Sequence, residues 1–136
     1  LPCLPATTKP HVRLTGIATM YRAGDGHTPG QFFGCHKEAK RLLGSAAFRE
    51  DLSTVAMRRE HVRCGQVIRI RNLRNGNRAL GLVLDRGPFG CIALDGTRTV
   101  QTGTCIGRRT ALIDLGVVIA RELEATGFDR VRLRWH

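Results

Sequence analysis

Two aspartates that adjoin apolar, strand-like runs are the residues of this chain best suited to acid–base chemistry. Asp85 directly follows the run Arg78–Leu84, and Asp114 lies between Ile113 and Leu115. A protonated carboxyl can deliver a proton to the leaving oxygen of a glycosidic bond while positive charge develops on the sugar. If both side chains line one groove, their repulsion raises the pKa of one of them and keeps it protonated near neutrality. The pair therefore indicates cleavage of a sugar polymer, provided that the fold brings the two carboxyls together.

Each of these aspartates also has a structural interpretation. Asp114 stands where a helix over residues 114–126 would begin, and an N-cap aspartate stabilises a helix by about 1 kcal/mol. Asp85 precedes the turn-forming segment Arg86–Pro88, where an aspartate commonly bonds the backbone of its own turn. The sequence leaves the catalytic and the structural interpretations open for both residues.

The chain is strongly basic. It has 22 Lys and Arg against 11 Asp and Glu, a net charge of +11, and 19 of the basic residues are arginine. Because a guanidinium binds carboxylate and phosphate groups bidentately, we expect an anionic partner: nucleic acid, an acidic cell-wall polymer or anionic lipid. The arginines recur throughout the chain, and neither a zinc-finger spacing nor an aromatic-rich RNA-binding motif is present, which disfavours a specific nucleic-acid partner.

Length and composition favour one small domain. The chain has 136 residues, of which 42% are hydrophobic, and its 16 glycines suit short strands joined by tight turns. No apolar run approaches the roughly 18 residues of a membrane-spanning helix. Residues 1–13 contain three prolines and predict an extended lead-in, and residues 14–136 predict the folded domain, which we expect to be a monomer.

The local patterns predict mainly β structure with one or two short helices. Strands are expected over residues 14–21, 55–57, 66–73, 78–84 and 131–135, and helices over residues 36–43 and 114–126, ended by Gly44 and Gly127. In residues 66–73 and 131–135, apolar residues alternate with arginines, which indicates one buried and one solvated face. A small closed barrel accommodates such strands without exposed edges.

The segment Asn75–Gly76 predicts a hairpin between the third and fourth of these strands. A two-residue loop would set Ile70 opposite Gly81, whereas a three-residue loop that includes Asn77 would set Ile70 opposite Leu82. We choose the three-residue loop, because a one-residue slip moves every side chain to the other face and only this register collects the large apolar groups on one side.

Five cysteines, at positions 3, 35, 64, 91 and 105, contain no C-x-x-C pair, which disfavours a structural zinc site or a thioredoxin-like motif. Disulfides are favoured: Cys91 and Cys105 bracket one loop, and a Cys35–Cys64 bond would tie the first half together and leave Cys3 over, but the sequence leaves the connectivity open. Five reduced, buried thiols are the alternative. The chain does not begin with Met and is expected to be a processed product. The expected location is extracytoplasmic.

Three segments of the chain carry a resemblance to a known family. Gly16–Tyr21 resembles the motif G-x-A-S-W-Y, and Val67–Gly76 resembles V-x-V-T-N-L-x-N-G. Asp85–Phe89, followed by Ile113–Leu115, resembles D-R-G-P-F and I-D-L-S. Together, over roughly residues 14–135, they resemble the rare lipoprotein A family of double-psi β-barrels, relatives of expansins and family 45 endoglucanases.

The resemblance implies a six-stranded double-psi β-barrel with a groove that accepts a glycan. Bacterial members act on peptidoglycan as lytic transglycosylases or binders, and expansins loosen walls without clear hydrolysis. Asp85 matches the aspartate of D-R-G-P, and Asp114 matches the aspartate of I-D-L-S, the acid of the endoglucanase and expansin relatives. The implied function is peptidoglycan cleavage by these two residues; the alternatives are a non-catalytic wall-binding or wall-loosening module and a protein-binding or structural barrel.

One motif departs from the family. Many bacterial members carry a functional histidine in T-A-A-H-x-x-L-P, but the corresponding stretch Thr54–Cys64 has Met or Arg at that place, and His61 is out of register. The pair Cys64–Gly65 is instead similar to the C-G of expansins.

Four further residues are candidates for glycan contacts: Tyr21, Thr28, Arg86 and Phe89. Tyr21 can stack on a sugar ring or fill the core. Thr28 belongs to a segment similar to the family's T-x-x-G loop, or to an ordinary turn, and Phe89 ends the D-R-G-P-F match. Arg86 suits the carboxylates of peptidoglycan, or a solvated face. The histidines lack metal-ligand spacing, so we expect no metal and no cofactor.

Overall fold

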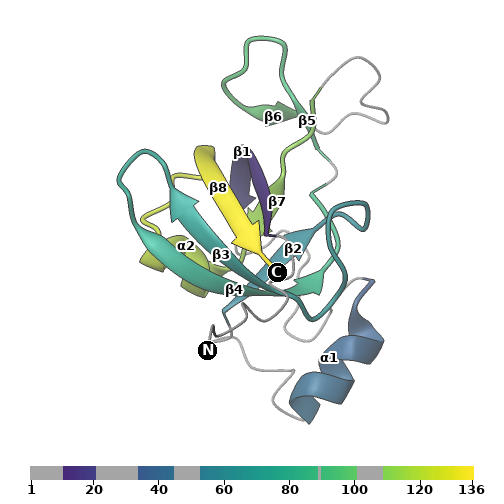
Figure 1. Cartoon of the computed structure of the whole chain (residues 1–136). Helices are drawn as coiled ribbons and strands as arrows, with labels where there is room; N and C mark the ends of the chain where they lie inside the picture. The colour runs from purple at the N-terminus through teal and green to yellow at the C-terminus, as the bar shows by residue number, and fades with distance from the viewer. Residues whose placement is uncertain (1–10, 21–33, 45–52, 89, 101–108) are drawn as a thin grey trace, which may run out of the picture.

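The computed structural model of the protein describes residues 11–20, 34–44, 53–88, 90–100 and 109–136 (Figure 1). These residues form eight strands and two short helices, in the order β1 (Val12–Met20), α1 (His36–Leu43), β2 (Thr54–Met57), β3 (Val67–Asn72), β4 (Arg78–Asp85), β5 (Cys91–Ile92), β6 (Thr99–Val100), β7 (Ile113–Leu115), α2 (Val117–Glu122) and β8 (Asp129–Trp135).

Six of the strands close into a barrel in the order β1-β7-β2-β4-β3-β8. The pairs β1–β7 and β2–β4 are parallel, and the other neighbours are antiparallel. Closure pairs the backbone of every barrel strand on both sides, so the barrel exposes no sheet edge. The predicted fold class, a mainly β six-stranded double-psi barrel with one or two short helices, is confirmed in its strand content, its closure and its helices. Strands β5 and β6 form a separate hairpin that projects from the barrel (Figure 1).

The barrel interior is filled by the apolar residues that alternate along its strands. In β3 the isoleucines, and in β8 Val131, Leu133 and Trp135, are buried, and the arginines between them lie outside, as the period-two pattern predicts. The largest fully buried side chains of the interior cluster are Val55, Met57, Ile68, Ile70, Val83, Ile113, Leu115, Ile119, Leu123, Val131 and Leu133. Helix α2 contributes Ile119 to this cluster and lies over β2 and β4.

The hairpin between β3 and β4 has a different register from the predicted one. Ile70 lies opposite Ala79, and the backbone N–H of Asn72 donates to the carbonyl of Asn77 at 2.8 Å, so the loop has four residues, 73–76. The buried Asn72 side chain decides this register. Its Oδ1 accepts the N–H of Arg74 at 3.1 Å and its Nδ2 donates to the carbonyl of Leu123 at 3.0 Å, which fixes the turn to the end of α2.

The new register also corrects the predicted inner face of β4. Leu80 is 57% exposed, while Gly81 faces inward. A Cβ atom on Gly81 would lie 2.8 Å from Cγ1 of Val55 and 3.2 Å from Cδ1 of Ile70, so the interior has no room for a leucine there. Leu84 is buried outside the barrel, against Ala39 of α1. The predicted three-residue loop is therefore wrong. It would place more large side chains inside the barrel than the interior has volume to hold.

Helix α1 has the predicted bounds and ends at Gly44, whose φ of 54° lies in the left-handed region that favours glycine. Helix α2 is shorter than predicted. It begins at Val117 behind the N-cap residue Gly116, because Asp114 belongs to strand β7 and the Gly116 N–H donates to the carbonyl of Thr54 at 2.9 Å. The interpretation of Asp114 as a helix N-cap is therefore wrong.

A disulfide joins Cys35, which precedes α1, to Cys64, which follows β2, as predicted, at a sequence separation of 29. Cys91 is also disulfide-bonded. Cys3 and Cys105, the other cysteines of the predicted scheme, lie outside the described residues.

Candidate functional site

Four residues on neighbouring barrel strands form a row that contains both candidate aspartates; we call it the aspartate row. Ala56 of β2 lies opposite Asp85 of β4 on one side and opposite Asp114 of β7 on the other. Thr19 of β1 lies opposite Asp114 and completes the row. Directly opposed residues of a sheet project their side chains to the same face. Strand β2 therefore brings together two aspartates that are far apart in sequence.

A β-bulge sets which residue of β4 enters this row. The pairing runs from Val55 opposite Val83 to Ala56 opposite Asp85, so Leu84 is an extra residue on β4. In an unbroken ladder Leu84 would lie opposite Ala56. The bulge thus exchanges a leucine for a carboxylate at this position, which is the re-aiming of a side chain that bulges produce beside functional sites.

The two aspartates are separated by the width of one strand. Two interstrand steps place the Cα atoms of Asp85 and Asp114 roughly 10 Å apart. Ala56 between them contributes only a methyl group, so its own side chain does not separate the two carboxyls, and it is itself buried. The backbone spacing is compatible with the wide carboxyl separation of about 6.5–9.5 Å that is found in one class of glycosidases.

The two carboxyls differ in their surroundings. Asp114 is half-buried, and its Oδ1 accepts a hydrogen bond of 3.2 Å from the Thr19 hydroxyl. Asp85 is only 5% exposed, and its Oδ1 accepts the backbone N–H of Arg86 at 2.8 Å. The local turn bond predicted for Asp85 is therefore present, and Asp114 is the more accessible of the two groups.

Arg86 anchors the turn that follows Asp85. Its Nη1 donates to the carbonyls of Val62 at 2.6 Å and of Met57 at 3.3 Å, at the end of β2 and in the loop beyond it. Gly34 lies against the Arg86 stem so closely that a Cβ atom there would collide with Cγ. Burial, aided by the nearby Arg59, lowers the pKa of Arg86. These contacts make Arg86 a positioning residue for Asp85.

The other sequence-predicted contacts lie outside the described part of the chain, namely Tyr21, Thr28 and Phe89. His61 is half-buried in the turn after β2 and belongs to no pair of the aspartate row. Among the described residues, no group of His, Cys, Asp and Glu has the arrangement needed to hold a metal ion.

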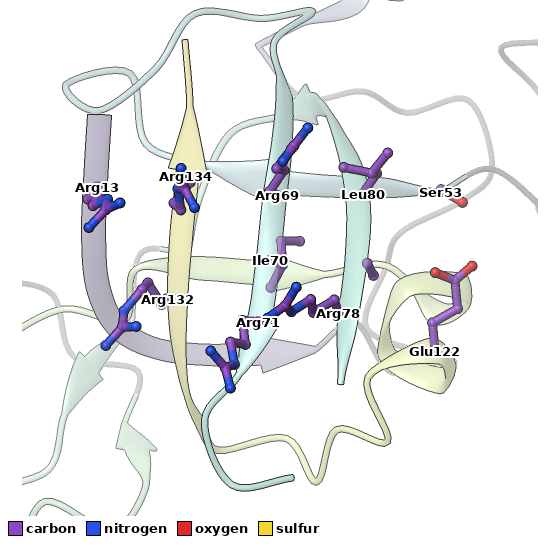
Figure 2. Close-up of a pocket in the computed structure, with 11 residues that line it drawn as sticks. Arg13, Ser53, Arg69, Ile70, Arg71, Arg78, Leu80, Glu122, Arg132 and Arg134 are labelled. Carbon is purple, nitrogen blue, oxygen red and sulfur yellow. The ribbon is translucent and has the colours of Figure 1, made fainter. Parts of the chain in front are cut away.

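A second surface, which the sequence did not predict as a unit, lies on another part of the outer face of the barrel. It is a groove of about 660 Å³ across the outer face of β1, β8, β3 and β4 (Figure 2). Six arginines line it, and we call them the arginine face: Arg13, Arg69, Arg71, Arg78, Arg132 and Arg134. The alternation of arginine with apolar residues indicated exposed side chains on single strands, but it held no information on which strands are neighbours.

Comparison with known proteins identifies no relative. No protein-family model matches the chain, and no curated protein matches its sequence. The resemblance to the rare lipoprotein A family therefore stays a hypothesis. Neither helix in the described part of the chain has the length and apolar composition needed to cross a membrane.

Proposed function

We propose that this protein binds and cleaves a cell-wall glycan, peptidoglycan, with Asp85 and Asp114 as its acidic pair. The observation that carries the proposal is the register that sets both aspartates opposite Ala56. Two carboxyls separated by one small residue can act on the two sides of a single glycosidic bond. The motif resemblance around both aspartates gives the substrate class.

The difference in exposure divides the roles between the two residues. Asp114, the more accessible group, donates a proton to the leaving oxygen as the glycosidic bond breaks. Asp85, held by its turn, stabilises the positive charge that develops on the sugar. The Asp114 carboxylate then takes the proton of the 6-hydroxyl of the same sugar as that oxygen attacks the anomeric carbon. The product is an anhydro sugar end, and no water is consumed.

The disulfide supports an extracytoplasmic site of action. Such bonds persist in oxidising compartments, and the Cys35–Cys64 bridge links two segments beside the aspartate row. We therefore propose that the protein acts outside the cytoplasm, as a secreted, periplasmic or phage-associated protein.

A second candidate function is a non-catalytic module that binds or loosens the wall. The 5% exposure of Asp85 favours it, because a carboxyl sealed in its own turn reaches a substrate only if the turn opens. The family histidine is also replaced in the segment Thr54–Cys64, and Met57 in that segment is buried in the core.

Digestion of purified peptidoglycan tests these functions. Mass spectrometry of the soluble products is expected to detect muropeptides with anhydro ends for the wild type, and none above background for Asp85→Asn. Asp95→Asn is the matched control, since Asp95 lies in the β5–β6 turn, outside the row. No new ends from a wild-type protein that pellets with the wall would overturn cleavage in favour of the binding module. A protein that neither cleaves nor pellets would overturn both.

A further inference from the structure

The arginine face is a grid in which like charges lie directly opposite one another. Along one row, Arg134 of β8 lies opposite Arg13 of β1 and opposite Arg69 of β3. Along the next row, Arg71 of β3 lies opposite Arg132 of β8 and opposite Arg78 of β4 (Figure 2). The rows are two residues apart along the strands, roughly 6.7 Å, and neighbouring strands are about 4.8 Å apart. Four like-charged pairs thus occupy one small patch.

In the described part of the chain, Glu122 is the one carboxylate residue that lines this groove, and no ion pair involves the six arginines. The ion pairs among the described residues are Arg58 with Glu60 and Arg74 with Asp129, and neither involves the arginine face. The buried Nε of Arg134, in the centre of one row, has no hydrogen-bond partner among the described residues. Directly opposed like charges destabilise a sheet. A surface that gathers them is therefore a candidate site for binding an anion.

At the edge of the grid, the His11 ring packs against the His136 ring, with ring centroids 4.0 Å apart and a tilt of 48°. The charge of His136, slight burial, and the charges of Arg134, Arg13 and Arg69 lower the pKa of His11. The charge of His136 is the largest of these causes, and the grid arginines add to it.

The other residues of the groove indicate the chemistry of the anion. All six cations are arginine, whose planar fork matches a carboxylate bidentately. Leu80, which is 57% exposed, gives the groove an apolar contact, and Ser53 and Glu122 supply a hydroxyl and a carboxylate that can bond sugar hydroxyls. No aromatic side chain lines the groove in the described chain, so it lacks the stacking platform that single-stranded nucleic acids require.

We propose that the arginine face is a docking site for an acidic, carboxylate-bearing glycan. The proposal rests on the proposed function, because it names a property of the same polymer that the aspartate row would act on. Strand β1 connects the two surfaces, since it carries Arg13 in the grid and Thr19 in the aspartate row. The two positions are roughly 20 Å apart along the strand, so a polymer held by the grid can extend to the aspartates.

Fluorescence anisotropy with labelled hexagalacturonate, which has one carboxylate per sugar, tests this docking site at low salt. Arg69→Gln/Arg71→Gln, which removes two charges from the central strand of the grid, is expected to weaken binding at least 30-fold. The matched control is Arg98→Gln/Arg109→Gln, which removes two exposed arginines outside the groove and is expected to change binding less than 3-fold. Neutral chitohexaose is expected not to bind.

Equal losses in both double variants would overturn the proposal, because net charge alone would then explain binding. Tighter binding of a single-stranded 12-mer oligonucleotide, or of phosphatidylglycerol vesicles, than of hexagalacturonate would also overturn it and would assign the face to nucleic acid or to lipid. Cleavage is measured separately. Binding that depends on the grid without anhydro products would refute only the proposed function, and anhydro products without grid-dependent binding would refute only the docking site.

Discussion

The two halves of the barrel wall differ in the burial and pairing of their polar side chains. Across β4, β2, β7 and β1, the polar side chains of the aspartate row have hydrogen-bond donors close by, and Asp85 is almost completely buried. Across β1, β8, β3 and β4, the arginines lie mostly in solvent and form no ion pair with the described residues. One half is held in a fixed geometry by the fold, and in our proposal the other is neutralised by a ligand.

This difference matches the demands of two tasks. Acid–base chemistry needs carboxyls held at a fixed separation, which the β2 register and the bulge at Leu84 provide. Recognition of a charged polymer needs unpaired charges that are available in solvent, even where they weaken the fold. If the two halves have separate tasks, a change in one half alters cleavage or binding without altering the other.

The largest expected effect is on cleavage. Asp114→Asn removes the accessible proton donor and is expected to lower the rate of anhydro-product formation about 10²–10⁴-fold, with binding of hexagalacturonate unchanged. Thr19→Val, which removes the hydroxyl that bonds Asp114, is expected to lower the rate only about 10-fold. Rates are measured by mass spectrometry of timed digests. A rate of Asp114→Asn within twofold of the wild type would show that the aspartate row is not catalytic.

Loss of the disulfide is expected to lower the stability of the protein and to impair cleavage more than binding. Cys35→Ala/Cys64→Ala opens a link across 29 residues and is expected to lower the free energy of unfolding by about 3 kcal/mol. Because Gly34 beside it lies against the Arg86 stem, cleavage is expected to fall while the arginine face still binds hexagalacturonate. Urea unfolding and anisotropy in the folded range measure both effects. Equal losses of cleavage and of binding would contradict the separation.

A smaller effect of opposite sign is expected in the arginine face. Arg71→Gln removes the positive charge opposite both Arg132 and Arg78, and is expected to raise the free energy of unfolding by about 0.5–1 kcal/mol and Tm by a few degrees. Arg98→Gln, on the β5–β6 hairpin, is expected to leave stability nearly unchanged. Thermal unfolding at low salt measures the difference. Destabilisation by Arg71→Gln would mean that the grid stabilises the fold.

The smallest effect is a change of pKa at His11. Since His136 and the arginines lower this pKa, His136→Gln or bound hexagalacturonate is expected to raise it toward 6.5. Because the His11 ring binds a proton less readily in the folded protein than in the unfolded chain, the free energy of unfolding is expected to decrease as the pH falls below 6.5. An NMR titration of the His11 ring measures the pKa. An unchanged value with saturating ligand would place the ligand away from the grid.

Features that depend on neighbouring residues along the chain are predictable from the residue pattern alone. Alternating apolar residues and arginines in β3 and β8 define a buried and a solvated face, because successive side chains of a strand point to opposite sides. The bounds of α1 and its end at Gly44 follow from the helix period and from a backbone conformation that glycine adopts easily.

The pairing of the strands and its register depend instead on contacts between remote segments. The predicted β3–β4 register was wrong because contacts that are remote in sequence set it. Asn72 bonds Leu123, and Gly81 packs closely against Val55. For the same reason Asp114 belongs to a strand rather than to a helix cap, and the arginines of β1, β3, β4 and β8 form one grid. Barrel closure pairs distant segments, and the volume and hydrogen bonds available at each crossing fix the register, which no local pattern encodes.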